Sequence, residues 1–363
     1  MTAYLIIENG KIMKGESFGA QGEVTGEIVF TTGMTGYLET LTDPSYYGQI
    51  VLQTFPLIGN YGVIPPDFES KDVRVRAYIT KYPCENPSNF RNEGSLDTFL
   101  KKQNIIAMHG IDTRRLTKII RKNGVMNGKI CIDVPTETDR EEAKAYIVKN
   151  AIASVSSKEI MKIETSVKTP PVSNSRVALM DFGAKSGIID CLAARGCEVW
   201  SFPCYASVKE ILQIKPHGIM LSNGPGDPAA EENKPIIETI AALEKSSIPI
   251  FGICMGHQLL ALAKGYKTQK LKFGHRGANQ SVKDMRTGRV YITSQNHGYE
   301  VITNSAEGCD DCSFINVNDG SCEGMDYGRS FSVQFHPEAR GGPLDTGFLF
   351  DKFIERMGGK ICR

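Results

Sequence analysis

A cysteine at a predicted sharp turn is the residue of this chain best suited to nucleophilic chemistry. Cys254 lies in Gly252-Ile-Cys-Met-Gly256, after the apolar run 248–251 and before a helix-like segment. Glycines two residues before and two residues after a nucleophile let a strand turn at once into a helix, whose N-terminus favours a thiolate. A buried structural cysteine is the alternative, but this spacing favours a nucleophile.

A thiolate nucleophile needs a base that takes and returns protons, and the base needs a carboxylate that orients it. His336 and Glu338, in Phe-His-Pro-Glu, offer both on one side of an extended segment, because side chains alternate along a strand. Only the fold can bring them to Cys254. The remaining histidines are weaker candidates. Two could border a site (His275, His297), two border apolar runs and are expected to be structural (His109, His217), and His257 lies inside the helix that follows Cys254.

A glycine-rich loop follows another predicted buried strand. Leu221-Ser-Asn-Gly224-Pro-Gly226-Asp-Pro228 is expected at the same sheet edge as Cys254. Its backbone N–H groups could hold an oxyanion or a carbonyl, although the loop taken alone is equally well an ordinary strand-to-helix connection. Together with the Cys254 turn, the loop indicates acyl transfer.

Motifs for nucleotides and metals are missing. Gly183-Ala-Lys-Ser lacks the spacing of a phosphate loop, and no dinucleotide fingerprint follows the first strand. Cys309 and Cys312 have metal-knuckle spacing, but no second pair follows, so a surface turn is favoured over zinc. We therefore expect no ATP, NAD or metal on this chain.

The second half of the chain alternates predicted strands and helices. Strands are expected at 176–180, 197–202, 218–222 and 248–251, and helices at 185–195 and 236–243. This rhythm predicts an α/β fold with a doubly wound, mostly parallel sheet and ligands at its carboxyl edge. Past residue 280 we expect short strands with turns between them.

The first half follows a different pattern. From residue 4 to about 63, short strand-forming runs alternate with glycine-rich turns, which predicts a β-rich α/β domain. Helical spacing appears at 96–100 and between a cap at Asp112 and Gly124. A charged and then Pro-rich stretch at about 135–171 is the expected linker, which divides the chain into domains 1–171 and 172–363.

Length and charge exclude several classes of protein. A chain of 363 residues suggests two domains, and a net charge of +1 gives no basic field for nucleic acid or an anionic membrane. No leader and no apolar run of about 18 residues is present, so we expect a cytoplasmic protein. The ten cysteines form no dense framework and are expected to be thiols.

The three motifs of the second half together resemble the signature of class I, or triad, glutamine amidotransferases. Within that class the chain most resembles the small, glutamine-hydrolysing subunit of carbamoyl phosphate synthase. The N-terminal half carries this likeness in Thr32-Gly-Met-Thr-Gly-Tyr, Leu41-Thr-Asp-Pro-Ser-Tyr46, Ile58-Gly-Asn-Tyr-Gly62 and Gly110-Ile-Asp-Thr-Arg114. The resemblance implies that Cys254 is the nucleophile, His336 the base and Glu338 its orienting partner.

The resemblance also implies a pocket for L-glutamine. The matching positions are Ser45, Gly224, Gly226, Met255, Gln258, Asn296, Gly298 and Tyr299. Met255 and Tyr299 stand where Leu and Phe are expected, and Arg276 stands where His is common. Because Ser45 belongs to the N-terminal domain, that domain is expected to complete the pocket and to supply much of the surface that docks the large subunit.

The reaction that the resemblance implies begins with attack of the thiolate on the side-chain amide of glutamine. Ammonia passes through a tunnel to the large subunit, which joins it to bicarbonate with ATP to make carbamoyl phosphate for arginine or pyrimidine biosynthesis. ATP and its metal are expected on that subunit, in a heterodimer that larger assemblies could contain. An amidotransferase for anthranilate, GMP or CTP synthesis and a degenerate binding subunit are the alternatives; the N-terminal motifs oppose the first, and the intact triad opposes the second.

Overall fold

The computed structural model describes residues 1–164, 175–303 and 309–359, and the chain divides into two compact units, Met1–Lys149 and Asn150–Arg363. The division comes earlier than the predicted one at 171, because α5 (Ala151–Val155) contributes Ile152 to the core of the second unit. The expected linker also contains α4 (Glu137–Ala145) and the short strand β10 (Met161–Lys162). Its Pro-rich part, 168–174, lies outside the described residues.

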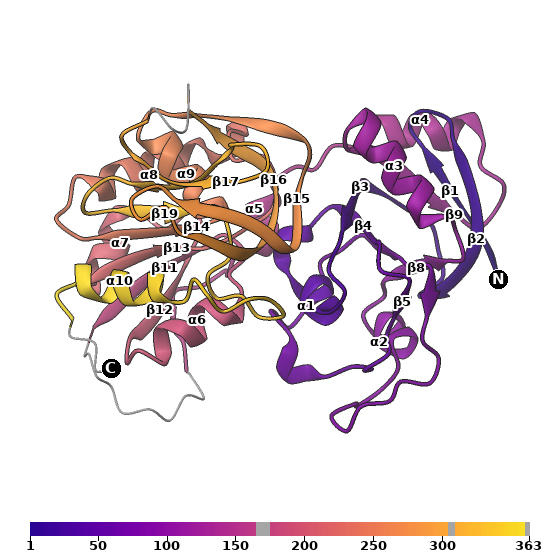
Figure 1. The fold of residues 1–363 in the computed structure, drawn as a ribbon, viewed down its shortest axis with the longest axis horizontal. Helices are drawn as coiled ribbons and strands as arrows, with labels where there is room; N and C mark the ends of the chain where they lie inside the picture. The colour runs from indigo at the N-terminus through magenta and orange to yellow at the C-terminus, as the bar shows by residue number, and fades with distance from the viewer. Residues whose placement is uncertain (165–174, 304–308, 360–363) are drawn as a thin grey trace. The chain divides into compact units, whose positions relative to one another are not determined.

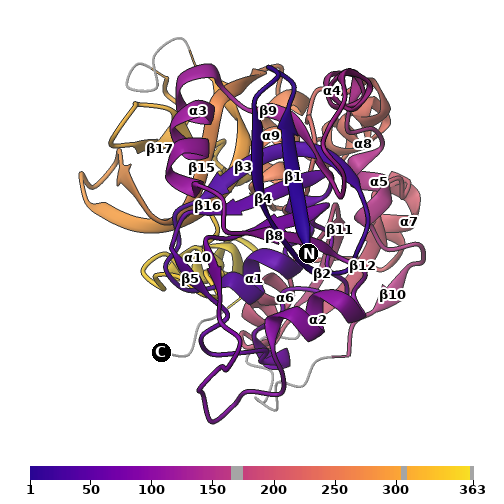
Figure 2. The same ribbon diagram turned by 90° about the vertical axis from the view of Figure 1, so that its right-hand side faces the viewer.

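The first unit is built around a closed barrel with the strand order β1-β2-β8-β6-β4-β3-β9, which confirms the predicted β-rich domain. Figure 2 shows several of these strands, in indigo and purple. They are β1 (Thr2–Ile7), β2 (Ile12–Gly19), β3 (Val24–Thr31), β4 (Gln49–Gln53), β6 (Ala77–Ile79), β8 (Ile106–His109) and β9 (Met126–Cys131). A separate pair consists of β5 (Leu57–Ile58) and β7 (Tyr82–Pro83).

Helices cover parts of this barrel. They are α1 (Tyr37–Thr42), α2 (Leu96–Lys102), α3 (Thr113–Asn123) and α4. As predicted, α3 begins after Asp112, whose side chain accepts a hydrogen bond from the N–H of Arg115 at 2.9 Å, and it ends at Gly124. The helix α1 was not predicted; it lies in a stretch expected to be mostly sheet.

The second unit contains one large sheet with the order β10-β12-β11-β13-β14-β19-β18-β16-β15-β17. Its parallel part confirms the predicted doubly wound fold and consists of β12 (Glu198–Pro203), β11 (Arg176–Asp181), β13 (Gly218–Leu221), β14 (Ile250–Ile253) and β19 (Phe331–Val333). The helices are α5, α6 (Ser186–Ala193), α7 (Val208–Gln213), α8 (Lys234–Glu244), α9 (Met255–Ala263) and α10 (Phe348–Arg356). Figure 1 shows this unit in pink to yellow.

Alternating residues of the parallel strands feed two cores. Val177 and Leu179 of β11 pack in a cluster with residues of α6 and α10, whereas Ala178 and Met180 pack in a cluster with residues of α7, α8 and α9. Helices therefore cover both faces of the sheet, as helices on a parallel sheet must. Among the described residues, the helices are too short or too polar for any of them to cross a membrane.

The C-terminal side of the sheet differs from the prediction of short strands. A long antiparallel hairpin joins β15 (Lys267–Asp284) to β16 (Val290–Ile302), whereas β17 (Cys312–Asn316), β18 (Cys322–Asp326) and β19 are short, as expected. The register of the hairpin shifts between Lys270 and His275 and again between Gly277 and Gln280. Such bulges bend a strand and redirect side chains, so the hairpin has no simple alternation that the sequence could display.

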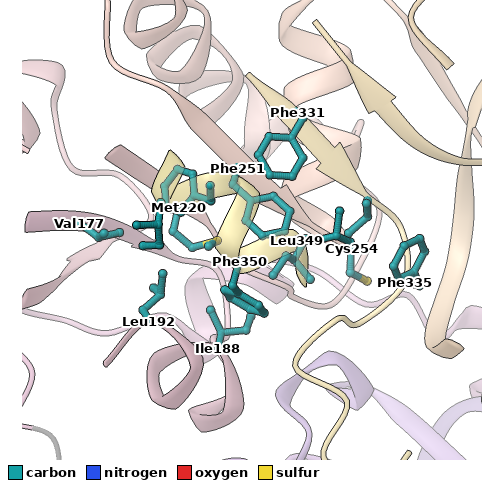
Figure 3. Packing of buried hydrophobic residues seen from close by; sticks show 14 of the residues in the cluster. Val177, Ile188, Leu192, Met220, Phe251, Cys254, Phe331, Phe335, Leu349 and Phe350 are labelled. Atoms are coloured by element: carbon teal, nitrogen blue, oxygen red, sulfur yellow. The ribbon is translucent and has the colours of Figure 1, made fainter. Parts of the chain in front are cut away.

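Phe350 of α10 anchors the C-terminal helix on the sheet. Its ring is fully buried and meets Phe251 of β14 edge to face, with ring centroids 5.7 Å apart (Figure 3). We expect Phe350→Ala to lower the free energy of unfolding by about 3–5 kcal/mol, because the cavity adds to the lost transfer energy. Urea unfolding measures this loss. The control is Phe348→Ala in the same helix, which removes a partly exposed ring and should lower the free energy of unfolding by less than about 1 kcal/mol.

Candidate active site

Cys254 stands at the junction between β14 and α9, as the sequence predicts. Its backbone has φ 54° and ψ −102°, and its N–H donates to Val333 O at 2.9 Å. A β-carbon on Gly252 would come within 2.6 Å of Gly256 O, and one on Gly256 would overlap Leu221 O. The two glycines are therefore required by close backbone contacts, and the turn presents Cys254 at the carboxyl end of β14.

His336 and Glu338 follow β19, the parallel neighbour of β14. Register pairs Ile253 with Val333, so the residues after each strand lie at the same sheet edge. His336 Nδ1 lies 2.6 Å from Glu338 Oε1, and both side chains are buried. The backbone N–H of His336 donates to Ser294 O at 2.9 Å, which ties this segment to β16.

The charges around His336 favour its imidazolium form. Burial and the Lys185 ammonium group oppose that form, but Glu338 and the neighbouring Cys254 outweigh them and raise the pKa of His336 to about 10. Burial tends to raise the pKa of Glu338, yet His336 and Lys185 together lower it. The structure therefore brings Cys254, His336 and Glu338 to one edge of the sheet, where Glu338 stabilises the imidazolium that forms when His336 takes a proton.

Lys185 is a site residue that the sequence analysis missed. Its Nζ lies 3.8 Å from Glu338 Oε1, and its side chain is nearly buried. Its N–H donates to Asn223 Oδ1 at 3.1 Å, which joins the start of α6 to the glycine-rich loop. The available signal is its place at the start of the predicted helix 185–195, which follows a predicted strand and therefore begins at the expected ligand edge.

The glycine-rich loop follows β13 and packs against the Cys254 turn. The Gly256 N–H donates to Ser222 O at 2.9 Å. Gly224 approaches the backbone of the neighbouring segment so closely that a β-carbon would overlap Phe182 O. Gly226 has φ 93°, in the left-handed region that favours glycine. The loop therefore lies beside the nucleophile, where its backbone could contact a substrate.

Other predicted pocket residues gather around Cys254 from α9 and β16. The Cys254 thiol donates to Asn296 O at 3.7 Å. Gln258 Nε2 donates to Tyr299 O at 2.9 Å and to Gln334 Oε1 at 2.8 Å, and Met255 is buried in the first turn of α9. Gly298 lies between Asn296 and Tyr299 on β16. Ser45 belongs to the first unit, in a single 3-10 turn, Pro44–Tyr46.

Two of the three histidines that were not expected to border a site have hydrogen-bond partners that fit a structural role. His217 Nδ1 accepts a hydrogen bond from the Arg176 N–H at 2.9 Å. His257 Nδ1 lies 2.9 Å from Ser332 Oγ, and burial lowers the pKa of His257 to about 3. The third, His109, meets Phe18 edge to face.

Two groups of potential metal ligands occur among the described residues. His275, His297 and Glu323 place their donor atoms within 4.8 Å of one another, and so do Glu23, Cys131 and Asp139. The second group surrounds Lys129, whose Nζ lies 2.7 Å from Asp139 Oδ1 and so supplies the positive charge itself.

The predicted surface turn at Cys309 and Cys312 is wrong for Cys312. This residue begins β17, is buried and lies 3.7 Å, sulfur to sulfur, from Cys322 of β18. The pairing of β17 with β18 brings Cys312 into a small apolar cluster, a contact that the local sequence does not reveal.

Comparison with known proteins gives matches over nearly the whole chain. Residues 5–130 match the family model of the carbamoyl-phosphate synthase small chain, CPSase domain, and residues 178–356 match class I glutamine amidotransferase. The carbamoyl phosphate synthase small chain of Fusobacterium nucleatum is 48% identical over 98% of each chain, and that of Clostridium perfringens is 47% identical over 98% of this chain and 99% of its own. The pyrimidine-specific small chain of Halalkalibacterium halodurans is 45% identical over 98% of this chain and 97% of its own.

Proposed function

We propose, from the premise that this chain belongs to the carbamoyl phosphate synthase small-chain family, that it hydrolyses L-glutamine and delivers ammonia to a large subunit. That subunit would join the ammonia to bicarbonate with ATP and make carbamoyl phosphate for pyrimidine or arginine biosynthesis. The observation that carries the proposal is the buried group of Cys254, His336 and Glu338 at the carboxyl edge of the sheet. We assign ATP and its metal to the large subunit, and the complex to the cytoplasm, where the free cysteines would stay reduced.

The proposed reaction is acyl transfer to sulfur. The Cys254 thiolate attacks the carbon of the glutamine side-chain amide, and His336 gives its proton to the leaving ammonia. Water then attacks the γ-glutamyl thioester, His336 accepts a proton from it, and glutamate leaves as the thiolate is restored. Glu338 keeps the imidazole oriented and stabilises its charged form throughout.

Backbone groups near the thiol would stabilise the charge that develops on the amide oxygen. We assign this role to the N–H of Met255, at the N-terminus of α9, and to one N–H of the loop at Gly224 and Gly226. The glutamine itself would contact the predicted pocket residues of the second unit (Gly224, Gly226, Met255, Gln258, Asn296, Gly298, Tyr299). Because β13, α9 and β16 are tied together by the hydrogen bonds described above, these groups would be positioned before substrate binds.

The test of this function uses the complex with a large subunit. The isolated chain is expected to hydrolyse glutamine slowly, and the large subunit with bicarbonate and ATP should accelerate it, because free ammonia at neutral pH is mostly protonated and unreactive. Synthesis from unlabelled glutamine in ¹⁵N-ammonium should give carbamoyl phosphate without label. An unchanged hydrolysis rate, or label in the product, would contradict coupled and channelled transfer.

Ser45 tests whether the first unit contributes to the glutamine pocket. In the full-length complex, Ser45→Ala is expected to raise the KM for glutamine about tenfold, the usual cost of losing one substrate hydrogen bond of about 1.4 kcal/mol. The exposed Ser88→Ala, also in the first unit, is the control and should leave the KM unchanged. Equal KM values in both variants would remove Ser45 from the pocket.

A further inference from the structure

The reaction proposed above leaves one buried polar cluster unused. His275 of β15 and His297 of β16 are direct cross-strand partners, and their rings meet edge to face with centroids 4.9 Å apart. Glu323 of β18 lies against both rings: its Oε1 is 3.4 Å from His275 Nδ1 and 4.0 Å from His297 Nε2. The Glu323 side chain is fully buried, so its charge must be balanced within the protein.

The partners of His275 identify the group that balances this charge. His275 Nε2 lies 2.8 Å from Asp319 Oδ2, while Nδ1 faces Glu323 Oε1. The ring therefore lies between two carboxyl groups, an arrangement that holds its orientation and favours its charged form. Burial opposes that charge, but the two carboxylates outweigh it and raise the pKa of His275 to about 9.

The opposite holds for His297. Burial, together with the adjacent charge of His275, holds its pKa well below the ordinary value, so its ring is neutral. Its Nδ1 lies 2.8 Å from Tyr299 O and its Nε2 lies 3.1 Å from Gln295 Oε1, so the ring is held by contacts on both sides. Within the same cluster, His275 is therefore the charged ring and His297 the neutral one.

Glu323 is held in place by three donors from neighbouring strands and turns. Gln295 Nε2 donates to its Oε2 at 3.0 Å, while Asn316 Nδ2 and Ser321 Oγ donate to Oε1 at 3.2 and 3.4 Å. The Glu323 carbonyl accepts from the Gln334 N–H at 2.9 Å, two residues before His336. The carboxylate is therefore a fixed point against which His275 can be oriented.

The cluster continues directly into the pocket proposed for glutamine. Tyr299 O accepts a hydrogen bond from His297 and a second one from Gln258. Asn296 comes directly before His297 on β16, and its carbonyl accepts a hydrogen bond from the Cys254 thiol. A displacement of the His297 ring would thus move the strand that lines the substrate and the nucleophile.

We propose that His275 is a positioning residue for glutamine: its imidazolium, held between Asp319 and Glu323, fixes the ring of His297 and keeps residues 296–299 in the conformation that binds substrate. The proposal deepens the proposed function and rests on its assignment of these residues to the glutamine pocket. His275 itself does not touch the reacting atoms in this arrangement, so its loss should weaken substrate binding more than the chemical steps.

The kinetic test uses Glu323→Gln and His275→Asn in the complex with the large subunit. Each is expected to raise the KM for glutamine about tenfold or more and to change kcat less than about threefold, because loss of a hydrogen bond to a charged group would displace the strand that binds the substrate. Because the two residues act as one unit, the double variant should cost no more than the larger single effect. Glu300→Gln removes a charge from the same hairpin outside the cluster and should behave as wild type.

A spectroscopic test reads the charge of His275 directly. In wild-type protein labelled with ¹⁵N-histidine, the imidazoles of His275 and His336 should both carry hydrogen on two nitrogens at pH 7.5; His275→Asn should remove one of these two sets of signals and His336→Asn the other. A neutral His275 at this pH would overturn the proposal. So would a wild-type KM that rises after treatment with a chelator, because a metal ion would then hold the cluster in place of the proton.

The failure of this inference is distinguishable from the failure of the proposed function. If the wild-type complex does not hydrolyse glutamine, the proposed function is wrong. If it does so with a measurable KM that Glu323→Gln and His275→Asn leave unchanged, only the positioning role is wrong. Fully additive effects of the two substitutions would also overturn it, because they would mean that the residues act independently.

Discussion

Cys254→Ala is expected to reduce glutamine-dependent synthesis of carbamoyl phosphate by at least about 10⁴-fold, as loss of a catalytic nucleophile commonly does. Synthesis from ammonium salts should continue at nearly the wild-type rate, because the large subunit uses ammonia without the sulfur of this chain. The two activities are measured on the same purified complex. The expected result is therefore a loss of glutamine use with ammonia use retained, in a purified complex that still contains this chain.

A matched control for this experiment is Cys84→Ala, which removes another thiol from the partly exposed surface of the first unit. It should leave both activities unchanged. Cys254 also pairs its backbone N–H with Val333 O, and alanine keeps that bond. Substantial glutamine-dependent synthesis in the Cys254→Ala complex would show that another residue is the nucleophile.

The second large effect concerns His336. We expect His336→Asn to lower glutamine hydrolysis by about 10³-fold or more and by a larger factor than Glu338→Gln, because asparagine cannot take or return the proton. Glu338→Gln leaves the imidazole in place and removes only the carboxylate that orients and stabilises it. A reversed order of the two variants at pH 7 would require the roles of these residues to be exchanged or dropped.

The same pair predicts a shift of the pH profile. Glu338 is a main cause of the raised pKa of His336, about 10, so the imidazolium persists through neutral and moderately alkaline pH. In Glu338→Gln the imidazolium loses its neighbouring carboxylate, and Lys185 and burial then lower the pKa of His336. The alkaline limb of kcat/KM is therefore expected to move to lower pH in that variant, and an unmoved limb would contradict the assignment.

The elements that position the nucleophile could be predicted because their signals are local. The turn at Cys254 needs Gly252 because a β-carbon there would meet the carbonyl of Gly256 in the same turn, and both glycines are visible in the sequence. The strand β11 is a short apolar run, and α3 has a cap at each end. In each case the physical cause lies within a few residues, so a pattern records it.

The features that could not be predicted depend on distant partners. The helix α5 belongs to the second unit because Ile152 packs into a core that is formed by residues much later in the chain. The long hairpin contains mostly polar or partly exposed residues with two register shifts, so no alternation marks its length. His275, His297 and Glu323 come from three strands, and nothing near any one of them in the sequence indicates the other two.

The backbone of Cys254 has a further consequence for the evolution of this chain. A residue with a β-carbon at φ 54° and ψ −102° is strained by about 1–3 kcal/mol, a strain that glycine would relieve. Selection for stability alone would therefore favour glycine at this position, whereas selection for a reactive sulfur keeps cysteine. The fold is in this respect a compromise between stability and activity, and a copy of the protein released from its catalytic duty would be free to become more stable at the site where it loses the reaction.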